Sequence, residues 1–210
     1  FVIPRHFKME GLHTVRQMLC PLDYLTVIDL KAAYPSMGIA PRYRDYFIFR
    51  FRDQFYRYRG TVFGVSSLPR AWTKLLRPFC AFLRSFGIRL VIFLDDLLVM
   101  SASFAQCAQD TQDVVTVLTW LGFIISTKEQ VKLVPEQRQV WCGVLICSLT
   151  MQFLLPPEKM KAVRVKMRRQ LRLCSAHAPL TLRQWSSVLG TMRACTVAVL
   201  PALLWSQGIR

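Results

Sequence analysis

The sequence has few acidic residues. Only 12 Asp and Glu stand against 28 Lys and Arg in 210 residues, which gives a formal net charge of +16. A positive field of this size attracts polyanions, either nucleic acid or an anionic membrane surface, and charge alone does not choose between them. Polar low-complexity segments are also lacking: apolar residues make up 53% of the chain and the mean hydropathy is +0.30. That composition excludes a disordered chain.

Long apolar runs and paired cysteines are missing as well. The longest uncharged apolar stretch, residues 194–208, is too short to span a bilayer and contains Pro201. The seven cysteines include no Cys-x-x-Cys pair, which favours reduced thiols over a disulfide framework or a zinc site. No signal peptide is visible and the chain opens on Phe1, so we expect it to be part of a longer protein. We expect an intracellular location, in the cytoplasm, the nucleus or both, and no membrane association.

Hydrophobic periodicity and turn residues indicate mixed strands and helices up to Pro156 and helices alone beyond it. We expect helices at 11–20, 68–86 and 103–121 and from residues 156 and 181 onward, and strands at 24–29, 88–100, 123–126, 140–146 and 151–154. Two alternating runs, 46–52 and 54–58, predict a hairpin. We expect its aromatic residues to pack in the core and on the sheet, with a platform for base stacking as the alternative. The fold class is therefore α+β, with a domain boundary at residue 156.

Three carboxylates stand in or at the end of apolar strands. Asp95 and Asp96 interrupt residues 90–100 (LVIFLDDLLVM), and Asp29 ends another apolar strand. An ionised carboxylate buried without a partner is costly, so these groups need a cation or a metal ion. Two plainer interpretations stay open: Asp95-Asp96 as a hairpin turn, and Asp29 as a strand-end cap. A turn would still present acids to a metal, and carboxylate oxygens suit Mg²⁺.

A dense run of cations follows the expected boundary. Residues 159–172 hold seven Lys and Arg and no acid. Like charges at helical spacing repel one another by a few tenths of a kcal/mol per pair, roughly, and an anionic partner would relieve this. A nucleic-acid backbone is one such partner, whereas a solvated helix face is the plainer alternative.

Five segments, in this order and spacing, resemble the motifs of reverse transcriptases. Residues 27–34 (VIDLKAAY) resemble motif A, residues 60–72 (GTVFGVSSLPRAW) motif B, and residues 93–96 (FLDD) the Tyr-x-Asp-Asp box of motif C. Residues 121–128 (LGFIISTK) are similar to motif D and residues 140–145 (VWCGVL) to motif E. Within the family, this chain looks most like DIRS-type retroelements, with Gypsy-like elements as the neighbouring possibility. The segments that carry this likeness are residues 7–10 (FKME), 87–89 (GIR), 181–184 (TLRQ) and 189–190 (LG).

The resemblance implies a right-hand polymerase. Residues 1–155 would form the palm, an antiparallel sheet flanked by helices with only part of the fingers, and residues 156–210 a helical thumb or connection. The implied activity is RNA-directed DNA polymerisation by two Mg²⁺ ions, or Mn²⁺, on a primed RNA or DNA template with deoxynucleoside triphosphates. Ribonuclease H and recombinase domains are expected in the parent polyprotein.

The resemblance also assigns roles to residues. Asp29, Asp95 and Asp96 would be catalytic and bind metal, assisted by the main-chain carbonyl of Ile28. The expected nucleotide-binding residues are Tyr34, as the steric gate, Gly64 and Lys128, and the expected nucleic-acid-binding residues are Lys159, Arg164, Arg168 and Arg172.

The sequence departs from the family pattern at several of these motifs. Ala32 stands where relatives of this type usually have Asp, Val62 replaces a Pro, and Lys128 is one position away from the expected motif D lysine. These departures favour one alternative function, a non-catalytic nucleic-acid-binding remnant of such a polymerase.

Overall fold

A computed structural model of the chain describes residues 6–126, 133–175 and 181–199. Spatial contacts divide the chain into two compact units. We call residues 1–19 with 23–136 the sheet unit, and residues 20–22 with 137–210 the C-terminal unit. This division concerns contacts alone, and the division into palm and thumb at residue 156 stays a prediction.

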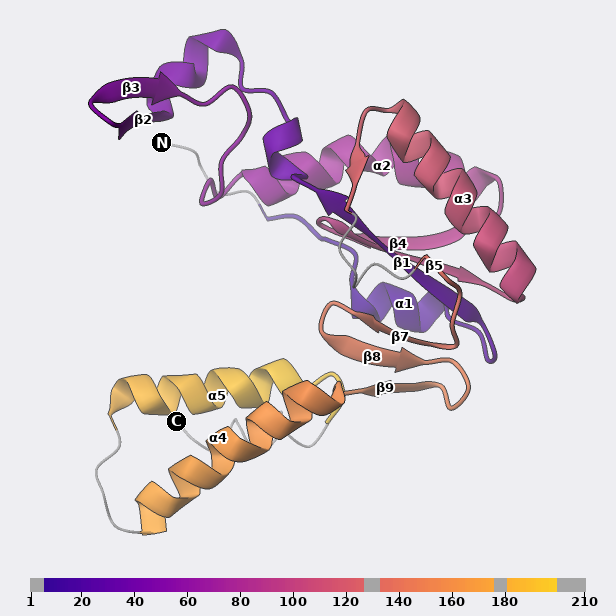
Figure 1. Cartoon of the computed structure of the whole chain (residues 1–210). Coiled ribbons are helices and arrows are strands. Elements are labelled where there is room, and N and C mark those ends of the chain that lie inside the picture. The colour runs from indigo at the N-terminus through magenta and orange to yellow at the C-terminus, as the bar shows by residue number, and fades with distance from the viewer. Residues whose placement is uncertain (1–5, 127–132, 176–180, 200–210) are drawn as a thin grey trace. The chain divides into compact units, whose positions relative to one another are not determined.

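The sheet unit is built on four antiparallel strands in the order β4–β5–β1–β6 (Figure 1). They are β1 (Tyr24–Lys31), β4 (Arg89–Phe93), β5 (Asp96–Ser101) and β6 (Ile124–Ile125). The expected strand at 88–100 is two strands joined by a two-residue turn at Leu94 and Asp95, so the hairpin interpretation is confirmed for Asp95, whereas Asp96 is the first residue of β5. Most residues of the central strands β1 and β5 are buried, and most of them are apolar.

Two long helices, α2 (Leu68–Ser85) and α3 (Phe104–Trp120), cover one face of this sheet. Trp72, Leu76 and Leu83 of α2 share a core with Ile28 and Leu30 of β1, along with Val114 and Leu118 of α3. The predicted helix limits are confirmed by local chemistry. Ser103 caps α3 by accepting a hydrogen bond from the Gln106 N–H, and Gly87 and Gly122 end the helices with φ of 83° and 86°.

Two ion pairs fix the edge strand β4 in place. The buried Asp23 carboxylate accepts two hydrogen bonds from the Arg89 guanidinium, at 2.6 and 2.7 Å, and Arg89 also donates to the Met18 carbonyl at the end of α1 (Leu12–Met18). Glu10 accepts from Arg84 at 2.7 Å and from the Ile92 N–H at 3.1 Å. The segment before β1 is thereby tied to the far edge of the sheet.

The expected hairpin forms, but its aromatic residues are exposed. Strands β2 (Ile48–Phe51) and β3 (Gln54–Arg57) pair around Arg52 and Asp53, both at positive φ, after the short helices η1 (Tyr34–Ser36) and η2 (Pro41–Tyr46). Every residue of both strands is solvent-exposed. The expectation of core packing was wrong: Phe49 instead stacks on Tyr56 and contacts Tyr58.

The C-terminal unit holds a three-stranded antiparallel sheet and two helices (Figure 1). The strands are β7 (Arg138–Trp141), β8 (Val144–Cys147) and β9 (Gln152–Leu154), and the helices are α4 (Pro157–Ser175) and α5 (Leu182–Cys195). The single strand expected at 140–146 was wrong, because Cys142 and Gly143 adopt positive φ and turn the chain back. The helix expected from residue 181 is confirmed, and Thr181 and Gln184 form a capping box at its start. None of the helices in the described ranges is long and apolar enough to cross a membrane.

Candidate active site

Strand register brings two of the three predicted carboxylates together. Asp29 of β1 lies directly opposite Asp96 of β5 in the antiparallel ladder. Side chains of opposed residues lie on the same face, and their Cβ atoms are roughly 5 Å apart. Because Ile28 and Leu30 face the α2–α3 core, alternation puts Asp29 and Asp96 on the other face of the sheet.

The third carboxylate, Asp95, lies in the turn between β4 and β5. The Leu30 N–H donates to the Asp95 carbonyl at 2.9 Å, which holds this turn against the end of β1. The buried Trp72 indole N–H donates to the Leu94 carbonyl at 2.8 Å from the helix side. Leu94 has φ of 56°, a conformation that costs a non-glycine residue about 1 kcal/mol or more. The turn is thus held in a strained shape by two hydrogen bonds from different elements.

Asp29, Asp95 and Asp96 supply carboxylate oxygens, the donors that Mg²⁺ prefers, and all three lie at the same end of the sheet. Asp95 is exposed, and Asp29 and Asp96 are partly buried. Within the described ranges, however, no three Asp, Glu, His or Cys side chains are grouped closely enough to hold a metal ion. The Ile28 side chain is wholly buried in the helix-side core, so only its main-chain carbonyl could assist. The metal-binding roles stay predictions.

Tyr34 lies beside this carboxylate end. Its ring makes edge contacts with Trp72 and Phe63, at centroid distances of 6.0 and 5.6 Å. Burial, and then the negative charge of Asp95, raise the pKa of Tyr34 above its ordinary value. The phenol therefore stays protonated at neutral pH and keeps a hydroxyl donor near Asp95.

Gly60 is a positioning residue that sequence reasoning missed. A Cβ there would meet the Pro35 carbonyl oxygen at 2.1 Å, so no side chain fits without backbone movement. Gly60 also forms a bridge with Gly38, and Thr61 donates to the Tyr34 carbonyl from its hydroxyl. These contacts attach motif B to the turn that carries Tyr34. The predicted Gly64 is exposed, with φ of 92° and open space around it, so its backbone conformation is what requires glycine.

The predicted motif D lysine, Lys128, lies outside the described residues. Just before it, the Ser126 N–H donates to the Asp29 carbonyl at 2.8 Å. Motif D is therefore hydrogen-bonded to the main chain of the motif A aspartate.

The four predicted nucleic-acid-binding cations of α4 fall into two kinds. Lys159 donates to the Gly143 carbonyl at 3.0 Å, which gives it a structural role. Arg164, Arg168 and Arg172 are exposed, recur every four residues along one side of the helix, and have no ion pair in the described part of the chain. Their spacing leaves three guanidinium groups open to an extended polyanion.

Comparison with known proteins identifies the class. The family model described as reverse transcriptase (RNA-dependent DNA polymerase) matches residues 6–146, and this chain belongs to that family. Curated relatives include the Gag-Pol polyproteins of woolly monkey sarcoma virus and gibbon ape leukemia virus, each 24% identical over 180 residues. Those matches cover 82% of this chain and only 10% of each polyprotein.

Solved structures show the same fold. The foamy viral protease-reverse transcriptase in complex with double-stranded DNA matches 92% of this chain and 31% of its own, with a TM-score of 0.71 and 16% identity. The same type of protein in complex with an RNA/DNA hybrid gives a TM-score of 0.69 at 15% identity, over 95% of this chain and 25% of its own. The α+β fold of a reverse transcriptase, predicted from five motifs, is confirmed.

Proposed function

We propose that this chain catalyses template-directed transfer of deoxynucleotides to a primer 3′-OH, as the palm and thumb of an RNA-directed DNA polymerase. The observation that carries the proposal is the sheet end where Asp29 pairs with Asp96 and the Asp95 turn is bonded to Leu30. Three carboxylates at one sheet end form an oxygen-donor set of the kind that Mg²⁺ takes.

Asp29, Asp95 and Asp96 would hold the metal, with the Ile28 carbonyl as a further oxygen. Two Mg²⁺ ions, or Mn²⁺, bound there would stabilise charge on the attacking and leaving oxygens. Tyr34, kept protonated, would screen the sugar of the incoming nucleotide, and Gly64 would lie under the template–nucleotide pair. Lys128 is the proposed proton donor to the leaving group.

The proposed substrates are a primed RNA or DNA template and deoxynucleoside triphosphates. Arg164, Arg168 and Arg172 would contact the duplex backbone, with Lys159 bracing α4. Duplexes of both kinds are bound by the foamy viral relatives. We further propose that the parent is an intracellular retrotransposon polyprotein of DIRS type, Gypsy-like being the alternative, with ribonuclease H and recombinase domains.

A second candidate is a nucleic-acid-binding remnant without turnover. It is favoured by Ala32 and Val62, which replace the usual residues of motifs A and B. Such a remnant would keep the fold and the basic helix while losing chemistry at the sheet end.

Primer extension on an RNA template separates the two candidates. The test uses the full-length protein that carries this chain, with Mg²⁺ and all four deoxynucleoside triphosphates. Extension that disappears in Asp29→Asn supports the polymerase. Tight duplex binding without any extension in either metal, by a protein that is folded, supports the remnant instead.

A further inference from the structure

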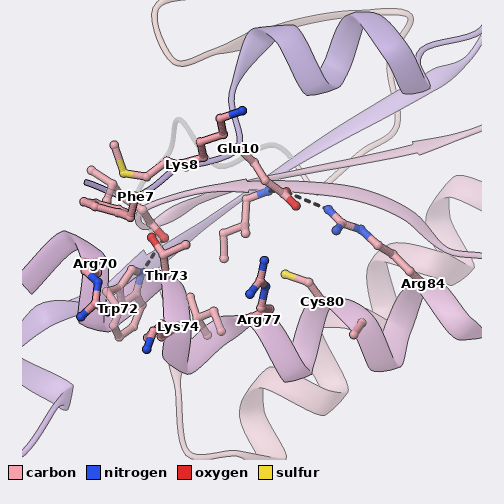
Figure 2. Close-up of a pocket in the computed structure, with 15 residues that line it drawn as sticks. Phe7, Lys8, Glu10, Arg70, Trp72, Thr73, Lys74, Arg77, Cys80 and Arg84 are labelled. Carbon is pink, nitrogen blue, oxygen red and sulfur yellow. Dashed lines mark hydrogen bonds and ion pairs between the residues drawn. The ribbon is translucent and has the colours of Figure 1, made fainter. Parts of the chain in front are cut away.

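A pocket lies on the helix side of the sheet unit, between residues 7–10 and α2, which lines it from Arg70 to Arg84 (Figure 2). Its volume is about 440 Å³, within the range of small-ligand pockets. Ile92 and Leu94 close it from the sheet. Because Asp29 and Asp96 project from the opposite face of the sheet, this pocket is separate from the carboxylate site.

The pocket wall is strongly basic. Lys8, Arg70, Lys74, Arg77 and Arg84 line it, against a single acid, Glu10. Glu10 is already used by Arg84 and the Ile92 N–H, and Arg84 also donates to the Leu90 carbonyl at 2.7 Å. Figure 2 shows Arg70, Lys74 and Arg77 along the same stretch of α2. None of these three has an ion pair with any residue the structure describes.

The positions of Arg70, Lys74 and Arg77 on α2 are electrostatically unfavourable. They follow one another at spacings of four and three residues, so neighbouring pairs repel. Arg70 also lies in the first turn of α2, which contains no acid, and the positive end of the helix dipole disfavours a cation there. A bound anion would relieve both effects at once.

The pocket floor is apolar and uncharged. Trp72 and Leu76 are almost fully buried beneath it, and Phe7 lies at its edge. Burial raises the pKa of the Cys80 thiol to about 12, so this group stays neutral and supplies no anion of its own. An apolar floor under a cationic rim matches a molecule with one flat, weakly polar part and one anionic part.

We propose that this pocket binds a nucleoside phosphate, with the base against the apolar floor and the phosphate oxygens on Arg70, Lys74 and Arg77. Arginine presents a planar fork of donors to phosphate oxygens, and lysine adds a point charge. The group can come from a free nucleotide or from one residue of a nucleic-acid strand. The proposal goes beyond polymerisation, because it needs neither metal nor turnover.

The test is equilibrium binding by the full-length protein in EDTA, with two separate probes, dATP and a fluorescent ten-residue oligothymidylate. The variant is Arg70→Gln/Lys74→Gln/Arg77→Gln. The matched control, Arg42→Gln/Arg52→Gln/Arg59→Gln, removes three cations from the same unit away from the pocket. Thermal melting verifies that each variant is folded, and the single variants Lys74→Gln and Arg77→Gln, at exposed positions, replace the triple variant if it does not fold.

We expect the pocket variant to weaken at least one probe by about tenfold or more, since charge-assisted hydrogen bonds are removed, and the control to change it less than twofold. A loss confined to the oligonucleotide would identify a strand as the source, and a loss of dATP binding a free nucleotide. Unchanged affinity for both probes, or an equal loss in the control, would overturn the proposal and leave only general basicity.

Discussion

Asp29 and Asp96 are held at the end of a buried sheet by pairing on neighbouring strands, whereas Arg164, Arg168 and Arg172 project from α4, a helix with no buried residue. The first region depends on backbone hydrogen bonds that fix individual atoms, such as Leu30 to Asp95. The second needs only charge at a regular spacing. We therefore expect a single substitution at the sheet end to remove most of the extension activity. Each substitution on α4 should lower the duplex affinity by a small, additive amount.

The largest expected effect concerns the stability of the same sheet, at the end opposite to the carboxylates, where Arg89 begins β4. Asp23→Ala should lower the free energy of unfolding by about 3 kcal/mol, because it removes the buried carboxylate partner of Arg89, a guanidinium that is only 28% exposed. Asp45→Ala breaks an exposed pair with Arg57 and should cost less than about 1 kcal/mol. Denaturant unfolding of both variants measures the difference. Equal losses of unfolding free energy would show that the Asp23–Arg89 pair stabilises the fold no more than an exposed pair does.

The next effect tests the chemistry of the carboxylate end of the sheet. Asp95→Asn should slow primer extension by at least about 100-fold, or about 2.7 kcal/mol, because it would remove one of the proposed metal ligands. Duplex affinity should stay nearly unchanged or rise slightly, since the proposed phosphate contacts are on α4. Single-turnover extension and duplex titration measure the two quantities, with Asp113→Asn on α3 as the control. A parallel fall in both would mean that the substitution unfolds the sheet.

The close backbone approach beside Tyr34 should matter somewhat less. Gly60→Ala places a methyl group against the Pro35 carbonyl, and we expect a loss of about 1–3 kcal/mol from the forced shift. Gly38→Ala is a matched control from the same bridge, because nothing lies within 4 Å of its added methyl group. Thermal or denaturant unfolding compares the two; a Gly60 variant as stable as the Gly38 variant would remove Gly60 from the site.

The smallest effect per residue belongs to α4. Replacing Arg164, Arg168 and Arg172 with Gln should flatten the slope of log K against log salt by roughly 0.9 for each B-DNA phosphate that the helix no longer neutralises. Affinity should fall by about the same factor for every duplex sequence, because interactions with the backbone carry no base information. Binding across a salt series measures this. An unchanged slope in a folded variant would leave α4 as a solvated face.

Local sequence signals predicted the ends of helices well, but they did not predict contacts between residues far apart in the chain. Ser103, Gly87 and Gly122 mark helix limits through caps that involve only their own neighbours. The turn at Cys142 was missed because a cysteine at positive φ has no sequence signature. The exposed Phe49 was missed because alternation identifies a strand face without saying what covers it.

The candidate site shows the same division. Apolar strand ends identified Asp29 and Asp95 as unusual, but the residues alone put them in one site only on the condition that their strands are neighbours. The register that pairs Asp29 with Asp96, and the Trp72 hydrogen bond behind the turn, join residues far apart in the chain. The fit of Gly60 against Pro35 is likewise a matter of backbone geometry, which a motif string does not encode.

The most direct test is the single-turnover extension rate at saturating primer–template, measured side by side for Asp95→Asn and for the triple variant of Arg164, Arg168 and Arg172. If, as proposed, the sheet end supplies the chemistry and α4 binds the duplex backbone, saturation should restore the triple variant to within about twofold of the wild-type rate. The Asp95 variant should stay at least about 100-fold slow at any concentration. A triple variant that remains slow at saturation, or an Asp95 variant that recovers, would contradict this separation.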